Sequence, residues 1–174
     1  MQRLSTLLNK FSDIGDGGLL IITLRGVYDR LSSQTIVSAA LAQATTTTKV
    51  KVGAPLIAVA SGVPIHIATA SADNFWTLSG VVADGKTNAF LLFVDKAGAA
   101  QSMIGTDVTT VVAGQLPTTF RFPQLPEGMA MVGYVVVSCS GGAFTGGTSN
   151  VATAGNFTVT FVNTVGAIDP SAVI

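Results

Sequence analysis

The chain has 174 residues, of which 48% are hydrophobic and only 10% are charged, whereas about a quarter of an average soluble domain is charged. Nine basic residues balance nine acidic ones, so no net positive field is available to neutralise phosphates, and nucleic acid is not an expected partner. A single cysteine excludes an intrachain disulfide, and the length fits one domain with an extension.

The first segment, residues 1–44, differs from the rest in charge, because seven of the eighteen charged residues fall within the first thirty. We interpret this segment as an N-terminal arm. Leu4, Leu7, Leu8 and Phe11 follow the i, i+3, i+4, i+7 spacing that places side chains on one helical face. The arm is therefore predicted to contain a short amphipathic helix.

The remainder of the arm is predicted to be extended after the break at Gly17 and Gly18. Residues 19–24 favour a β segment, and residues 36–44 fit either a helix or a strand. The apolar run at residues 19–22 is far too short to cross a bilayer, and no secretion-signal pattern follows Met1. We expect a chain made in the host cytoplasm, with no membrane partner.

From residue 45 to residue 174, short apolar runs separated by turn residues predict a single β-sandwich or barrel-like domain of antiparallel strands. Ser61 and Gly62 are placed to form a two-residue hairpin turn. Pro64, which lacks an N–H, indicates an edge strand or the start of a strand. Trp76 is expected to anchor the core, and Gly85 and Gly98 are suited to turns.

The unbroken apolar run at residues 90–94 predicts a strand that is buried on both faces. Three prolines between residues 116 and 126 predict an extended, irregular segment. The remaining expected strands are residues 49–60, 63–68, 75–82, 99–104, 129–138 and 157–161. Cys139 is expected to be a small buried apolar residue in a strand.

Part of the β domain resembles virion structural proteins of tailed phages. The resemblance rests on residues 90–98 (FLLFVDKAG), 123–128 (PQLPEG), 132–137 (VGYVVV) and 144–148 (FTGGT), with residues 45–51 (TTTTKVK) similar to the opening of those proteins. It covers residues 45 to 163 and leaves the arm uncovered. Its motifs consist of strand and turn residues.

The resemblance implies a capsid decoration, cement or head-fibre-base protein without catalysis. Its partners would be further copies of itself, as a homo-oligomer and commonly a trimer, together with the major capsid protein or other virion proteins. The expected location is the capsid surface of the virion. A tail or baseplate position is the alternative within the same class.

The arm is the predicted interface with the shell. Its apolar residues would supply affinity, and its charges would supply orientation. The candidate interface residues are Leu4, Leu7, Leu8, Phe11, Arg25, Tyr28 and Arg30.

Candidate catalytic and metal-binding residues are few. His66 is the only histidine, so a usual zinc ligand set is not available, and its side chain is expected to face away from Ile65 and Ile67. Asp13 and Asp16 lack the further oxygen ligands of a calcium loop. We expect neither an enzyme nor a cofactor or metal site.

Acidic residues predicted in turns, Asp73, Asp84, Asp95 and Asp107, are expected to accept hydrogen bonds from backbone amides. The rival interpretation is a carbohydrate-binding or adhesin β-module that uses Trp76, Tyr28 and Tyr134 as a platform. Each of these aromatic residues also has a structural role available within a strand. The missing secretion signal argues against a secreted adhesin.

Overall fold

The computed structural model describes residues 24, 27–28, 31–69 and 75–166. Residues 24, 27–28 and 31–32 are helical, and the described residues from Gln34 onward form an all-β domain, as predicted. The described strands are β1 (Gln34–Val37), β2 (Ala42–Gln43), β3 (Lys49–Lys51), β4 (Leu56–Ala60), β5 (Val63–Ile67), β6 (Trp76–Thr77), β7 (Val81–Val82), β8 (Lys86–Val94), β9 (Ala100–Ile104), β10 (Val108–Thr109), β11 (Ala130–Cys139), β12 (Phe144–Thr145) and β13 (Phe157–Asn163).

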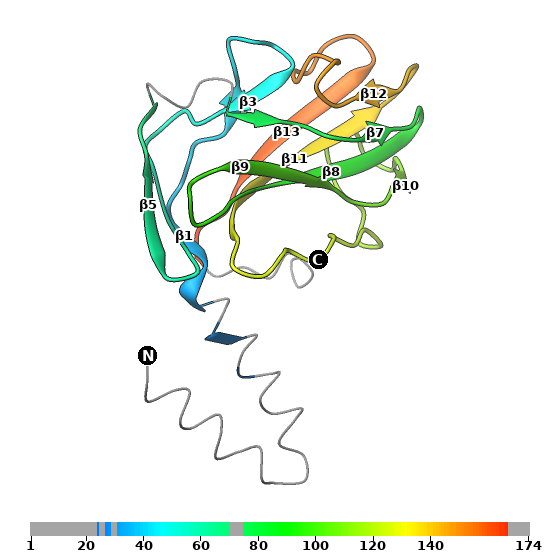
Figure 1. The fold of residues 1–174 in the computed structure, drawn as a ribbon. Coiled ribbons are helices and arrows are strands. Elements are labelled where there is room, and N and C mark those ends of the chain that lie inside the picture. Colours follow the sequence, from blue (N-terminus) through cyan, green and yellow to red (C-terminus); the bar gives the residue numbers. More distant parts are fainter. Residues whose placement is uncertain (1–23, 25–26, 29–30, 70–74, 167–174) are drawn as a thin grey trace, which may run out of the picture.

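The largest sheet has five antiparallel strands with β8 and β11 at its centre. β11 pairs with one edge of β8 and carries β13 on its other side, while β9 and β10 share the opposite edge of β8. In Figure 1, β8, β11 and β13 cross the middle of the body, and β1 and β5 lie at its left side.

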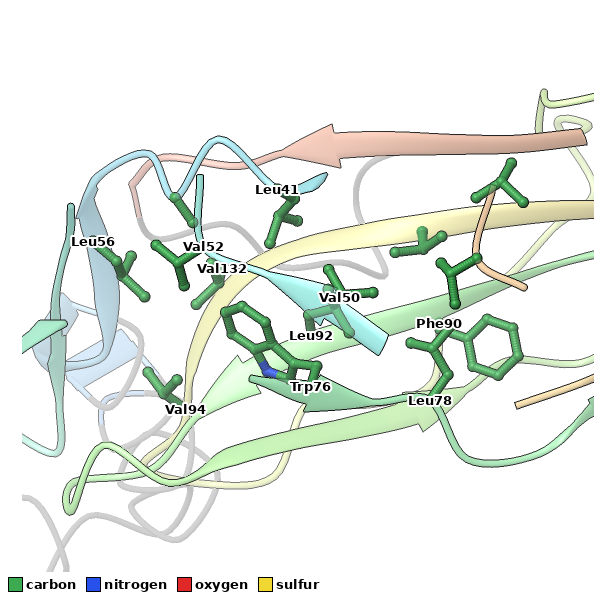
Figure 2. Packing of buried hydrophobic residues seen from close by; sticks show 14 of the residues in the cluster. Leu41, Val50, Val52, Leu56, Trp76, Leu78, Phe90, Leu92, Val94 and Val132 are labelled. Carbon is green, nitrogen blue, oxygen red and sulfur yellow. The ribbon is translucent and has the colours of Figure 1, made fainter. Parts of the chain in front are cut away.

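Three smaller sheets, with strand orders β1–β4–β5, β2–β3–β6 and β7–β12, supply the second layer. The main core lies between the layers. In Figure 2, Trp76 and Val50 from the small sheets lie against Leu92 of β8 and near Val132 of β11. This two-layer packing of antiparallel sheets is that of a β-sandwich.

β8 is buried on both faces, which confirms the prediction from its unbroken apolar run. Phe90, Leu92 and Val94 point into the main core, because alternate side chains of a strand point to opposite faces. Leu91 and Phe93 belong to a second, smaller core.

The proline-rich segment contributes to the second core. It has no regular secondary structure between residues 110 and 129, as predicted for residues 116–126. Phe120 and Phe122 from this segment are buried against the outer side of the five-stranded sheet. Their rings meet edge to face, with centroids 5.0 Å apart. The segment therefore acts as a cover over the central strands.

The β4–β5 hairpin also agrees with its prediction. Ser61 and Gly62 both have positive φ, at 51° and 75°, the combination required by the two-residue turn that matches the twist of the strands. β5 is an edge strand, which is one of the two positions that Pro64 indicated.

The prediction of one continuous strand at residues 49–60 is wrong. The structure divides this stretch into β3 and β4, which belong to different sheets. Gly53 lies at the division and donates its N–H to the carbonyl oxygen of Ala39 at 2.9 Å. A Cβ at this position would collide with the carbonyl oxygen of Ala40. The close approach of two backbones thus turns the chain from one sheet to the next.

The structure also differs from the predicted division at residue 44. Residues 34–43 contain β1 and β2, which pair with β4 and β3 of the β domain. Thr35 is fully buried and donates its hydroxyl to the carbonyl oxygen of Met131 at 2.7 Å. Hydrogen bonding to distant strands, which the local charge pattern does not indicate, places this stretch in the sandwich.

Candidate functional site

The sheet β1–β4–β5 presents one face to the core and one face outward. Leu56, Ala58 and Ala60 of β4 and Ile65 and Ile67 of β5 point inward and are buried. The side chains on the other side of the strands form what we call the outer face. It consists of Gln34, Ile36, Val37, Ile57, Val59, Pro64 and His66.

The outer face is apolar and accessible. Ile36 is 51% exposed, Val37 is 41% exposed and Ile57 is 36% exposed. None of the residues in the three strands is charged. An accessible sheet face would ordinarily carry polar side chains, so this face has the composition of a surface that is covered by another molecule.

The strand register arranges the outer face in two rows. Val37, Ile57 and His66 lie side by side in one row. Gln34, Val59 and Pro64 form the other. Ile36 is the extra residue of a bulge in β1 and adds a further apolar side chain beside the first row.

Exposed apolar side chains are concentrated at this end of the molecule. Nine of the twelve exposed large hydrophobic residues in the described ranges belong to the β1–β4–β5 sheet or to the segments that enter and leave it. Val165 is one of them and precedes Gly166, which bridges to Thr35 of β1. The nine are Leu24, Val27, Tyr28, Leu31, Ile36, Val37, Ile57, Val63 and Val165.

The free edge of this sheet is poorly suited to pairing with another strand. In a two-residue hairpin, the two residues that flank the turn form a hydrogen-bonded pair, and here these are Ala60 and Val63. Along an antiparallel ladder, hydrogen-bonded pairs alternate with pairs whose backbone N–H and C=O groups point away from the partner strand. Pro64 and His66 are therefore the residues whose backbone nitrogens face outward from β5. Pro64 has no hydrogen to donate, which favours contact through the face over contact through the edge.

The predicted interface residues are largely not covered by the described structure. Tyr28 is described and is 44% exposed, close in sequence to β1. Leu4, Leu7, Leu8, Phe11, Arg25 and Arg30 lie outside the described residues, as do the predicted helix, Asp13 and Asp16. The interface assigned to the arm stays a prediction.

The outer face was missed by sequence reasoning, although a signal was present. Between Arg30 and Asp73 the only charged residues are Lys49 and Lys51. β4 is apolar at all five positions, yet among the described residues the sheet that contains it is covered on one side only. A charge-free stretch of this length, combined with an edge strand marked by Pro64, was the available indication.

The aromatic platform proposed for carbohydrate binding does not form. Trp76 is completely buried, and its Nε1–H donates to the carbonyl oxygen of Phe93 at 3.2 Å. Tyr134 packs against Phe122 with ring centroids 4.9 Å apart, and burial raises the pKa of its hydroxyl. Trp76 thus has the core role predicted for it and is not available to a sugar.

His66 behaves as its position in the strand predicted. Its side chain is exposed, whereas Ile65 and Ile67 on either side are buried. The histidine therefore belongs to the outer face, where it lies opposite Ile57.

The described turn aspartates accept hydrogen bonds from the backbone, as expected. Asp84 accepts the Gly141 N–H at 2.6 Å, and this bond is the main reason why the pKa of its carboxyl is lowered. Asp95 accepts the N–H groups of Ala97 and Ala99. Asp107 accepts from the Ala83 N–H at 2.9 Å, whereas Asp73 lies outside the described residues.

Cys139 is buried near the end of β11, as predicted for a small apolar residue. Burial is the main cause that raises the pKa of its thiol. Its sulfur lies 3.7 Å from the carbonyl oxygen of Val82.

Within residues 24, 27–28, 31–69 and 75–166, no three His, Cys, Asp or Glu side chains lie close enough to share a metal ion. No helix in that part of the chain is long and apolar enough to span a membrane. Comparisons with family models, curated proteins and solved structures found no match to the chain.

Proposed function

We propose that the chain is a non-enzymatic structural protein of a tailed-phage virion, in the role of a capsid decoration or cement protein that assembles as a homo-oligomer and stabilises the head through subunit contacts. The observation that carries the proposal is the outer face, an exposed apolar sheet surface without charge. The resemblance of residues 45–163 to virion proteins supplies the kind of assembly.

Covering the outer face with another molecule is energetically favourable. Removing apolar area from water releases about 25 cal/mol per Å², and part of that gain is spent on the lost freedom of the associating molecules. A protein with many copies on one shell can repeat the same contact around the lattice. Apolar contacts of this kind stabilise a particle without requiring a catalytic residue.

Low surface charge fits the same role. Charged residues keep free monomers soluble and apart, and the segment between Arg30 and Asp73 has only two of them. A sandwich domain whose accessible sheet face is apolar is suited to a permanent place in an assembly.

The test uses particles of the phage that encodes the chain. We expect the protein in purified particles at a fixed ratio to the major capsid protein, and we expect particles made without its gene to release their DNA at a lower temperature. Particles that contain none of the protein would contradict the virion assignment. Gold-labelled antibodies bound to tails instead of heads would contradict the decoration role.

A further inference from the structure

We propose that the outer face is the surface through which two copies of this chain associate, face to face and related by a two-fold axis. The inference rests on the proposed function for its premise that the chain self-associates. It adds which surface is used and what covers it. It also replaces the three-fold contact implied by the resemblance with a two-fold contact at this face.

The outer face lacks charged side chains, which suits contact with an identical surface. A surface that meets a copy of itself brings identical side chains together, so any charged group near the centre would face a like charge or lose its water without a partner. The three strands of this sheet carry no charged residue. An apolar, uncharged face satisfies this requirement of a contact between identical surfaces.

The outer face has two hydrogen-bonding side chains. Gln34 of β1 and His66 of β5 occupy opposite corners of the two rows, with Ile57 and Val59 of β4 between them. A two-fold axis in the plane of the contact can place Gln34 of each copy beside His66 of the other. The Gln34 amide donates one N–H to the carbonyl oxygen of Leu31 at 3.3 Å, which leaves its second N–H and its oxygen for the imidazole, itself a donor and an acceptor. The apolar centre of the contact would then be flanked by two matched polar pairs.

The outward edge of β5 is unfavourable for pairing with a second copy. Pro64 removes a backbone donor from the outward side of β5, and this disfavours a continuous sheet formed by edge pairing of two copies. Packing of one sheet face on another needs no such donor. Ile57 and Val59 at the centre of the three strands then become the residues most completely buried by the second copy.

The experiment measures the mass of the full chain by light scattering after gel filtration, over a range of loading concentrations. We expect the wild-type chain to form a species with the mass of two chains or a multiple of two. Ile57→Glu places two like charges near the axis, and we expect it to weaken association on the order of 100-fold or more. The matched control is Val111→Glu, at a site that is 77% exposed and follows β10, which lies across the body from β5 in Figure 1.

Circular dichroism and thermal unfolding of both variants check that the monomers are folded. If Ile57→Glu is unfolded, Ile57→Thr, which keeps a β-branched side chain, takes its place, and a smaller loss of association in the same direction is expected. A wild-type monomer at every concentration would overturn the proposal, as would a trimer or an assembly that Ile57→Glu leaves intact. The measurement uses no phage particle, so a two-fold dimer can be found even if the chain is absent from virions, and the two failures are distinguishable.

Discussion

Trp76 donates its indole N–H to the carbonyl oxygen of Phe93 at 3.2 Å, joining a strand of the small sheets to the central strand β8 of the large sheet. Both residues are almost completely inaccessible to solvent. The bond therefore connects the two layers of the sandwich inside its core. It also gives the buried carbonyl oxygen of Phe93 a hydrogen-bond donor.

Replacing Trp76 with Phe should lower the free energy of unfolding by about 3 kcal/mol, because the substitution removes ring volume from a closed core and leaves the indole's hydrogen bond unmade. Urea unfolding followed by circular dichroism measures the change. Val81→Ala, at a side chain that is 54% exposed, is the control and should change stability little. Equal stabilities for the two variants would contradict the role given to Trp76.

Tyr134 provides a prediction at high pH. Burial raises the pKa of its hydroxyl above the ordinary 10.0, so its contribution to stability is fully present below about pH 10 and is lost as the pH rises through the folded-state pKa. In Tyr28→Phe, Tyr134 is the only tyrosine, and the absorbance of its phenolate can be titrated alone. A midpoint at or below 10.0 would show that the ring is more accessible than the structure indicates.

Cys139 can report on opening of the sandwich. Its thiol is the only one in the chain, is buried in β11 and has a raised pKa, so both access and thiolate formation limit its reaction. We expect an aromatic disulfide reagent to label the native chain far more slowly than the urea-unfolded chain. Similar labelling rates in the two states would be inconsistent with a closed core around β11.

Asp84 provides the corresponding prediction in acid. The Gly141 N–H lowers the pKa of this carboxyl below its ordinary 3.8, so the carboxylate stabilises the fold above that pH, and the effect is lost as the pH falls through the lowered pKa. Asp84→Asn removes the titration while keeping an acceptor oxygen. Unfolding curves collected from about pH 5 to about pH 2 should therefore depend less steeply on pH in the variant; parallel curves for the two proteins would argue against the Asp84–Gly141 bond.

Several elements could be predicted because their cause is local. The apolar run of β8 requires cover on both faces, and the Ser61–Gly62 turn follows from backbone preferences of adjacent residues. Pro64 indicates an edge because proline cannot donate to a neighbouring strand. In each case the residues that determine the structure are neighbours in the sequence.

Other elements depend on partners that are distant along the chain. β1 pairs with β4, and Thr35 donates to Met131 at a separation of 96 residues. Local charge placed this stretch in an arm, whereas these distant bonds place it in the sandwich. The division between β3 and β4 likewise depends on Ala39 and Ala40, whose carbonyl groups approach Gly53.

The outer face depends both on the local sequence and on packing with distant parts of the chain. Its lack of charge is visible in the sequence between Arg30 and Asp73, but its exposure depends on which side of the sheet faces the core. β4 alone is apolar on both sides, so the sequence pattern does not distinguish a doubly buried strand from one with an exposed apolar face. Only the packing of Leu56 and Ala58 into the core assigns Ile57 to the surface.

The most direct test of the outer face is hydroxyl-radical labelling of the wild-type chain at low and high protein concentration, read out by mass spectrometry. We predict that labelling of Ile57, Pro64 and His66 falls as concentration rises, because a second copy covers them. Labelling of Val111 and Val112, which are exposed on the loop after β10, should remain constant. Unchanged labelling of Ile57 and His66 at concentrations where the chain is associated would contradict the account.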